Sequence, residues 1–487
     1  MEDRISELPE VVLLHILSFL PMCQVVRTSI LSRRWRHLWT QVPVLDFGTH
    51  EPEFSLWSIE SFINYCLMLY NAPKIKKFCA RVDQSRICHC TLDAWLRFAV
   101  QHNVEELDMD YIAGYHSGNL HFFLYNLMPG LFSQCGELRA LRLRGCALNL
   151  LPSLCLGSLR TLKLYHVIIV SDLNTSGFPL LESLTLYGCN SRKHLSIYSP
   201  NHKLEKLKIC DVSDVLYASG DLIIDAPYLS SIEISGYMRH SGYSIKNLSS
   251  VTHACLNFTG MFRTAYTLFG DHMSVKLLES LSHVKTLKLC QWSIQNMALM
   301  GKPILENSVF STTCLELGAS LNRCEIKGIA HLLINSHYLA TLAVDIQMMV
   351  GRNYDIAESE GWEMLELAMS SLLHLKTVQI YNLFRTTEVS FYGEASHIIN
   401  KVLTDCEKEI TLLEVVLKSC KMLDKMFISA INTQDPTEWM LISELLLKLT
   451  EVTFKFIEAC LSFYLLATHS DERVMIAVLN VNLDDIF

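Results

Sequence analysis

The sequence lacks the short motifs that carry most enzymatic chemistry. It contains no phosphate-binding P-loop, no glycine-rich dinucleotide fingerprint, no G-x-S-x-G turn and no H-E-x-x-H zinc motif. Cys is abundant, but no Cys has a clear activating neighbour of the kind that a catalytic thiolate needs. We therefore predict that the chain is not an enzyme, that it has no catalytic residue and that it uses no cofactor.

An excess of positive charge is also missing. The 41 Lys and Arg residues are outnumbered by 50 Asp and Glu, and the formal net charge is −9. Such a balance gives no general affinity for nucleic acid or for an anionic membrane. We expect neither of them as a partner.

Long apolar runs and a secretory signal are not found either. The sequence starts MEDR, which is not a basic region followed by an apolar stretch and a cleavage site. The most apolar stretch near the end, 452–467, is short for a membrane span and contains Lys455 and Glu458. We expect no transmembrane helix, and a protein of the cytoplasm or the nucleus.

The Cys residues predict neither a disulfide framework nor a metal site. There are 17 of them, an odd number, scattered along a chain without a secretory signal, which favours reduced thiols. Cys88, His89 and Cys90 form a cluster that suggests a metal site, but the second ligand pair that zinc spacing requires is missing. Cys146, Cys189, Cys210 and Cys290 follow apolar strand patterns and are expected to be structural.

What the sequence does contain is, first, a compact apolar unit near its beginning. Apolar residues recur there at three- and four-residue spacing and predict a helix, which Pro21 ends. A short second helix and a third, from about Ser32 to Trp39, follow. Two Trp residues and a Leu on so short a helix exceed what three small helices can bury, which indicates an interface anchored by aromatic residues.

Residues 5–43 resemble the F-box, the adaptor-binding module of Skp–cullin–F-box (SCF) ubiquitin ligases. The run LSRRWRHLW at residues 31–39 is especially similar to the plant subtype. The resemblance implies that the chain binds a Skp-type adaptor and, through it, a cullin. The residues that it implies face the adaptor are Leu8, Pro9, Ile16, Leu17, Val26, Ser32, Trp35 and Trp39.

Two other interpretations of this unit exist. Its apolar residues can be the ordinary core of a larger N-terminal domain. Alternatively, Arg33, Arg34 and Arg36 alternate with Trp as in a DNA-binding helix, but that function predicts a basic domain, and the chain is acidic.

The middle of the chain repeats the pattern L-x-x-L-x-L, in which Val, Ile or Met also occupy the apolar places. Between five regular copies the central apolar residue advances by 21, 22, 23 and 25 positions, within the range of leucine-rich repeats. The regular copies lie at 138–143, 159–164, 181–186, 204–209 and 229–234, and looser copies at 104–109, 251–256, 284–289, 339–344 and 375–380. Alternate Leu residues point inward from a short strand, and each unit buries them only by stacking on its neighbours.

The repeats resemble those of plant F-box proteins, and residues 372–380 and 414–426 resemble the FBD region that closes many of them. The predicted fold class is α/β: a three-helix F-box, a leucine-rich repeat solenoid with a curved parallel sheet, and an FBD-like α/β region. The predicted boundaries are 1–45 for the F-box, 46–100 for a linking segment, 101–345 for the solenoid, 346–430 for the FBD-like region and 431–487 for a divergent tail. A helix is expected at 59–70 within the linking segment.

Basic and aromatic residues alternate with the inward Leu residues and are expected to face outward. They are Arg142, Arg144, Lys163, Tyr165, Tyr187, Lys206 and Lys208. This strip is either an ordinary solvated surface or a docking surface for an acidic or phosphorylated segment of a target protein. No motif argues for a small-molecule pocket.

The resemblance implies a non-catalytic subunit that holds a target protein near the ubiquitin-loaded enzyme recruited by the other SCF subunits. The alternative is a repeat-based binding scaffold that acts without degradation, or a decayed family member. The intact apolar helix faces favour the first. The region after residue 449, which has no counterpart of the family's usual ending, favours the second, because a solenoid needs a polar end cap.

Overall fold

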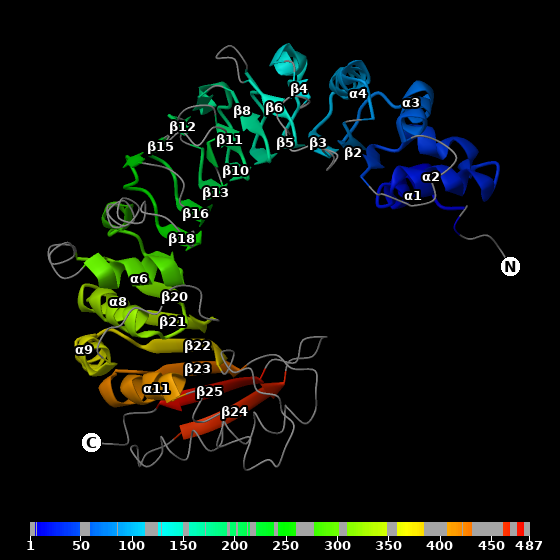
Figure 1. The fold of residues 1–487 in the computed structure, drawn as a ribbon. Coiled ribbons are helices and arrows are strands. Elements are labelled where there is room, and N and C mark those ends of the chain that lie inside the picture. The colour runs from blue at the N-terminus through cyan, green and yellow to red at the C-terminus, as the bar shows by residue number, and fades with distance from the viewer. Residues whose placement is uncertain are drawn as a thin grey trace. The chain divides into compact units, whose positions relative to one another are not determined.

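The chain forms two compact units built on parallel β-strands (Figure 1). One unit comprises Met1–Ser230 and Arg239–Ser250, and the other comprises Ser231–Met238 and Val251–Phe487. The computed structural model describes residues 5, 7–48, 59–84, 86–112, 125–127, 129–149, 155–170, 172–191, 195–200, 203–211, 213–214, 221–237, 242–259, 277–300, 309–347, 358–383, 407–420, 422–430, 461–467 and 475–481.

The first unit begins with a helical module of four short elements. They are α1 (Glu10–Leu17), α2 (Met22–Arg27) and the 3₁₀ helices η1 (Thr28–Ile30) and η2 (Trp35–Gln41). Pro9 and Pro21 stand at the N-cap positions of α1 and α2, where the missing N–H group costs no helical hydrogen bond. The third helix, predicted from about Ser32 to Trp39, is the 3₁₀ helix η2, which is more tightly wound than an α-helix and begins at Trp35.

Residues 46–100, expected to be a linking segment, contribute directly to the sheet. They contain α3 (Ile59–Leu69), which confirms the predicted helix, followed by β2 (Lys77–Asp83) and α4 (His89–Gln101). β2 pairs in parallel with β1 (Val44–Phe47) and with β3 (Glu106–Ile112). Its inward residues are Phe78, Ala80 and Val82, so it has the burial pattern of a repeat strand without any Leu.

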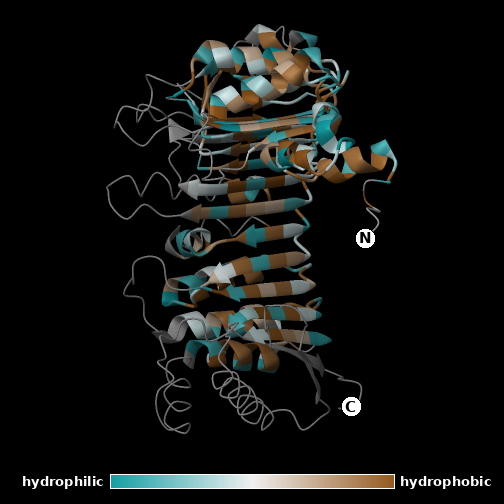
Figure 2. Ribbon diagram, turned by 90° about the vertical axis from the view of Figure 1, so that its right-hand side faces the viewer, coloured by the Kyte–Doolittle hydropathy of each residue, from teal (hydrophilic) through white to brown (hydrophobic). Residues whose placement is uncertain are grey.

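The strands of the first unit form where the repeat pattern predicts them. β5 (Ala140–Arg144), β7 (Thr161–Tyr165), β10 (Ser183–Tyr187) and β13 (Lys206–Cys210) follow β3 in the parallel order β3-β5-β7-β10-β13. The pairing is in register, and apolar and polar residues alternate along the strands (Figure 2). The central apolar residues of the first four regular copies, all buried, are aligned side by side: Leu141, Leu162, Leu184 and Leu207.

Two further sheets of short parallel strands complete the repeats of the first unit. One has the order β14-β11-β8-β6-β4 and the other β17-β15-β12-β9. Their strands are β4 (Asn126–Leu127), β6 (Ala147–Leu148), β8 (Ile168–Ile169), β9 (Leu173–Asn174), β11 (Asn190–Ser191), β12 (Leu195–Tyr198), β14 (Ser213–Asp214), β15 (Asp221–Asp225) and β17 (Gly242–Lys246). The 3₁₀ helices η3 (Pro129–Gln134) and η4 (Thr175–Gly177) lie between strands. Cys146 and Cys189 stand between the long and the short strand of their repeats and are fully buried, which confirms their structural role.

A left-handed residue that turns the chain directly follows each of β5, β7, β10 and β13. Gly145 and Gly188 have φ angles of 71° and 59° at this place, and His166 and Asp211 adopt the same conformation at equivalent positions. The turning residue donates its backbone N–H to the next repeat, as from Gly145 to the Tyr165 carbonyl at 3.0 Å. A Cβ atom on Gly145 would come within 2.1 Å of the Tyr111 carbonyl oxygen, so this turn requires glycine.

In the second unit, helices replace the short outer strands. The parallel strands β16 (Ser231–Tyr237), β18 (His253–Thr259), β19 (Thr286–Leu289), β20 (Cys314–Ala319), β21 (Thr341–Ile346), β22 (Thr377–Leu383) and β23 (Lys425–Ala430) pair in this order. Helices α6 (Gln291–Met300), α8 (Arg323–Ile334), α9 (Glu358–Ser370) and α11 (Glu407–Ser419) cover one side of the sheet (Figure 1). Within the segment predicted to be FBD-like, 346–430, the described elements α9, β22, α11 and β23 continue the alternation of helix and strand.

The predicted divergent tail, 431–487, supplies the antiparallel end of this sheet. β25 (Met475–Val481) pairs with β23 and with β24 (Leu461–Ala467), in both cases antiparallel. The parallel series of the second unit therefore ends at β23.

Helices α6 and α8 approach each other unusually closely. A Cβ atom on Gly328 of α8 would lie 2.2 Å from the Ile294 carbonyl oxygen of α6. Glu325 of α8 is fully buried, and its carboxylate accepts hydrogen bonds from the Gln295 side chain at 2.8 Å and from the Ser320 backbone N–H at 2.6 Å. The absence of a side chain at Gly328 permits this approach.

We predict that Gly328→Ala destabilises the second unit. The added methyl group must push α6 and α8 apart, at a cost of about 1–3 kcal/mol in the free energy of unfolding. Urea unfolding of the full chain, followed by Trp fluorescence and circular dichroism, measures the change in midpoint.

Gly361→Ala in α9 is the matched control. A Cβ atom there meets Ile326 at an ordinary 3.4 Å, so the gain in helix propensity should leave the chain equally stable or more stable, by up to about 1 kcal/mol. Equal midpoints for the two variants would contradict the close packing of α6 on α8.

Candidate functional site

The helical module presents several exposed apolar side chains. Val12, Ile16 and Phe19 follow one another at helical spacing along α1 and its end, and Phe19 is 75% exposed. Ile30 and Leu31 are also exposed, Ile30 to 86%. Large exposed apolar side chains are typical of protein-binding surfaces. We call these five residues the apolar surface of the module.

The residues predicted to face an adaptor divide into buried and accessible ones. Leu17, Trp35 and Trp39 are buried within the chain, whereas Pro9 and Ile16 are exposed. Leu8, Val26 and Ser32 are half-buried.

Another part of this chain covers aromatic surface that the three small helices leave unburied. Trp39 stacks on Tyr65 of α3, with ring centroids 6.3 Å apart. Helix α3 lies beyond the short module that the sequence suggested, so the surplus aromatic surface is covered by this chain itself. Trp35 and Trp39 therefore support the module from within, and the apolar surface lies elsewhere on it.

Arg34, which the DNA-binding interpretation used, has a structural contact. Its Nη2 atom donates a hydrogen bond to the Leu8 carbonyl at 2.5 Å and so connects η2 with the chain just before α1. Arg33 and Arg36 are exposed.

The predicted basic strip lies on the outward positions of adjacent strands in the first unit. The register aligns Arg142, Lys163, Thr185 and Lys208 in one row. The next row contains Arg144, Tyr165, Tyr187 and Cys210, and Lys206 stands opposite Ser183 in the row on the other side. The outward positions of β5, β7, β10 and β13 thus carry five cations and no carboxylate.

Two Asp residues of β3 pair with the first cations of the strip. Arg142 donates to Asp108 at 3.0 Å, and its guanidinium lies 4.9 Å from the centroid of the Tyr165 ring. Asp110, which is 5% exposed, accepts from Arg81 at 3.1 Å and from Arg144 at 3.5 Å. These pairs orient the two Arg side chains and reduce the positive charge at the β3 side of the strip.

Sequence reasoning missed Asp108 and Asp110. Both occupy outward positions of β3, which contains the end of the looser copy at 104–109. Aligning this copy with the regular copies would have placed them beside Arg142 and Arg144. Lys163 and Lys206, farther along, are exposed.

Burial disfavours the thiolate form of the buried repeat cysteines. Burial raises the pKa of Cys189 to about 12, and it also raises the pKa of Cys146. Cys88 and Cys90 lie with their sulfur atoms 2.6 Å apart at the start of α4, and both are exposed. Within the described ranges, no three His, Cys, Asp or Glu side chains gather in the way a metal ion requires. None of the helices in that part of the chain is both long and apolar enough to cross a membrane.

Comparison with known proteins matches two regions of the chain to known domains. Residues 5–47 match the F-box domain, and residues 70–405 match the family described as At1g61320/AtMIF1, LRR domain. The F-box match covers the helical module and β1, and the LRR match covers the strands from β2 to β22.

Similar proteins from Arabidopsis thaliana are named for the same two domains. F-box/LRR-repeat protein At5g02910 is 28% identical over 449 residues, which cover 89% of this chain and 89% of that protein. Putative F-box/LRR-repeat protein At5g02930 is 30% identical, with 70% of this chain and 72% of that protein covered. F-box/FBD/LRR-repeat protein At5g56420 is 29% identical over 57% of this chain and 64% of its own length.

An F-box followed by leucine-rich repeats is the composition of an F-box substrate-adaptor protein. The parallel strands with aligned, buried Leu residues are the structural counterpart of the repeat match. The chain therefore belongs to the At1g61320/AtMIF1 leucine-rich repeat domain family and carries an F-box at its N-terminal side.

Proposed function

We propose that this chain is the substrate-recognition subunit of an SCF ubiquitin ligase, acting in the cytoplasm or the nucleus. Its F-box binds a Skp-type adaptor, which connects it to a cullin, and its repeats capture a target protein for ubiquitination. The observation that carries the proposal is an F-box with an exposed apolar surface in the same chain as a repeat sheet with charged and aromatic outward residues.

Such a subunit contributes proximity and no bond-making chemistry. Holding the target and the ubiquitin-loaded enzyme in one assembly raises their effective concentration. The chain then needs two binding surfaces and no catalytic group.

We assign adaptor binding to the apolar surface of the module. Exposed Ile30 and Phe19 gain most from burial against a partner, at about 1.5–3 kcal/mol for each fully buried side chain. Ile16 belongs both to this surface and to the residues that the sequence predicts as adaptor contacts. Leu17, Trp35 and Trp39 hold the module in shape beneath the surface, and contacts by Leu8, Pro9, Val26 and Ser32 stay a prediction.

We assign target binding to the basic strip. Lys163, Lys206 and Lys208 offer ammonium groups, and Arg144 offers a guanidinium, beside the rings of Tyr165 and Tyr187. Carboxylates and phosphates make charge-assisted hydrogen bonds with such groups. An acidic or phosphorylated segment of the target is therefore the complementary ligand.

Replacing Phe19 or Ile30 by Asp should weaken adaptor binding more than tenfold. Each substitution removes apolar burial and places a charge in the interface. The measurement is the dissociation constant of the full chain with a purified Skp-type adaptor, by biolayer interferometry. Both positions are exposed, so the variants should keep the wild-type circular dichroism spectrum.

Leu373→Asp is the control for this experiment, because Leu373 is 71% exposed in the turn before β22 and should not affect adaptor binding. Leu17→Asp and Trp35→Ala are unsuitable, since both side chains are buried and their loss disrupts the module itself. A folded wild-type chain that does not bind the adaptor would remove the ligase role and leave a repeat-based scaffold.

Reversing two charges of the exposed strip should weaken recognition of acidic peptides. The double variant Lys163→Glu and Lys206→Glu loses two charge-assisted contacts, and we expect at least a tenfold fall in retention. The probe is an array of synthetic Asp/Glu-rich and phosphoserine peptides with alanine counterparts. Exposed Lys203 and Lys376, which lie outside the outward rows, serve as control sites for the same change to Glu. Equal retention of the acidic peptides by the wild type and the double variant would refute the assignment. So would wild-type retention of the alanine peptides as strong as that of the acidic peptides.

A further inference from the structure

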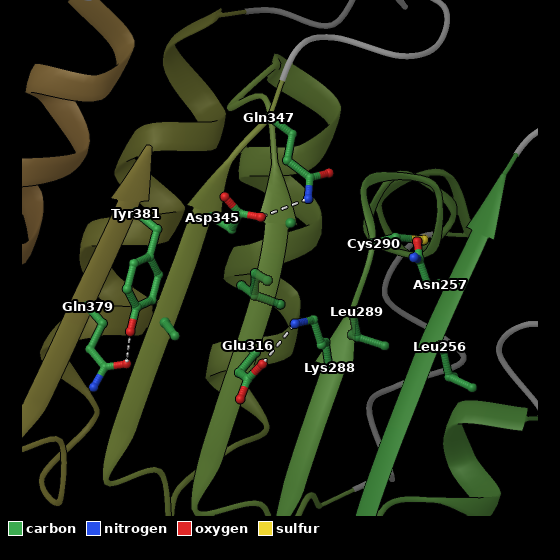
Figure 3. Close-up of a pocket in the computed structure, with 13 residues that line it drawn as sticks. Leu256, Asn257, Lys288, Leu289, Cys290, Glu316, Asp345, Gln347, Gln379 and Tyr381 are labelled. Atoms are coloured by element: carbon green, nitrogen blue, oxygen red, sulfur yellow. Dashed lines mark hydrogen bonds and ion pairs between the residues drawn. The ribbon is translucent and has the colours of Figure 1, made fainter. Parts of the chain in front are cut away.

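The sheet of the second unit has a cavity of about 330 Å³ on the side that carries its outward residues (Figure 3). Strands β18 to β22 line it. The polar residues at its walls are Asn257, Lys288, Glu316, Asp345, Gln347, Gln379 and Tyr381.

Two small residues, Gly318 and Ala343, stand among the larger ones that line the cavity. The register places Ala343 between Glu316 and Gln379, and Gly318 beside Asp345. A Cβ atom on Gly318 would already lie 2.6 Å from the side-chain nitrogen of Gln347. The Gln347 side chain therefore occupies the space above Gly318, and Ala343 places only a methyl group at the cavity.

The polar groups around this space are held in place by hydrogen bonds. Asp345 accepts from the Gln347 side chain at 3.1 Å and from the Asn382 side chain at 2.6 Å. Because an ionised carboxylate has about four acceptor positions, Asp345 keeps further capacity. Tyr381, 41% exposed, donates its hydroxyl to Gln379 at 2.8 Å, which fixes the orientation of its ring.

The charges of the cavity favour a cation. Lys288 pairs with Glu316 at 3.2 Å, so this ammonium is compensated. Asp345 is a second carboxylate, and its hydrogen-bond partners are the neutral amides of Gln347 and Asn382. The carboxylates of the lining thus outnumber its Lys, and an anion would face net repulsion.

We propose that this cavity binds an arginine side chain of the captured protein. The guanidinium would donate to Asp345 and lie against the ring of Tyr381, side chains of neighbouring strands that both stand at the cavity (Figure 3). A planar, five-donor guanidinium suits a carboxylate beside an aromatic ring better than a compact lysine ammonium does. The proposal rests on the proposed role in target capture and adds a specificity element separate from the basic strip.

The direct test uses small probes and no adaptor. Saturation-transfer difference NMR on the full chain compares N-acetyl-arginine methylamide with its citrulline counterpart, which has the same shape without the charge. We expect saturable binding of the arginine probe and at least tenfold weaker binding of the citrulline probe. Equal binding of the two would indicate a neutral polar ligand and overturn the proposal, as would no binding of the arginine probe.

Variants locate the binding. Asp345→Asn keeps the size of the side chain and should weaken arginine binding about tenfold, and Tyr381→Leu should weaken it as well. Glu233→Gln is the matched control, since Glu233 occupies an outward position of β16 in the same sheet but does not line the cavity. Binding unchanged in Asp345→Asn, or equally reduced in Glu233→Gln, would overturn the assignment. Adaptor binding is measured separately, so either proposal can fail alone.

Discussion

The structure depends on the in-register stacking of inward aliphatic side chains between neighbouring repeats. Leu141, Leu162 and Leu184 stand at equivalent places of adjacent strands, and none of them reaches water to any extent. A single repeat has too few partners to bury such residues, so each strand is stable only between neighbours. The same stacking fixes the register, because a slip by one residue would turn the Leu residues outward and bury Arg142 and Lys163.

Because the inward positions are committed to packing, the outward positions are available for recognition. In the first unit they carry Arg and Lys beside two Tyr rings, oriented in part by Asp108 and Asp110. In the second unit they line a cavity whose carboxylates outnumber its Lys residue. The two units therefore present different chemistry at the outward positions of their strands. On the proposed assignments, the chain would distinguish a target with both acidic and arginine-containing segments from a target with only one of them.

The sequence predicts the parts of the fold that depend on large aliphatic residues at fixed spacing, and the repeat strands appear at their predicted places. It misses β2, because Phe78 and Ala80 fill inward positions without Leu. It also misses contacts between distant segments, such as Trp39 on Tyr65, which decide what is buried. The neighbours of Gly318 and Ala343 at the cavity are known only from the register, so these two residues carry no signal in the sequence alone.

The central claim is that adaptor binding uses the apolar surface of the F-box and leaves the repeat faces open for a target. Hydroxyl-radical footprinting of the full chain, with and without a purified Skp-type adaptor, reads side-chain accessibility directly. We expect the adaptor to protect Phe19 and Ile30 and to leave Tyr187 and Tyr381 as reactive as in the chain alone. Protection of the two Tyr residues with unchanged reactivity of Phe19 and Ile30 would contradict it.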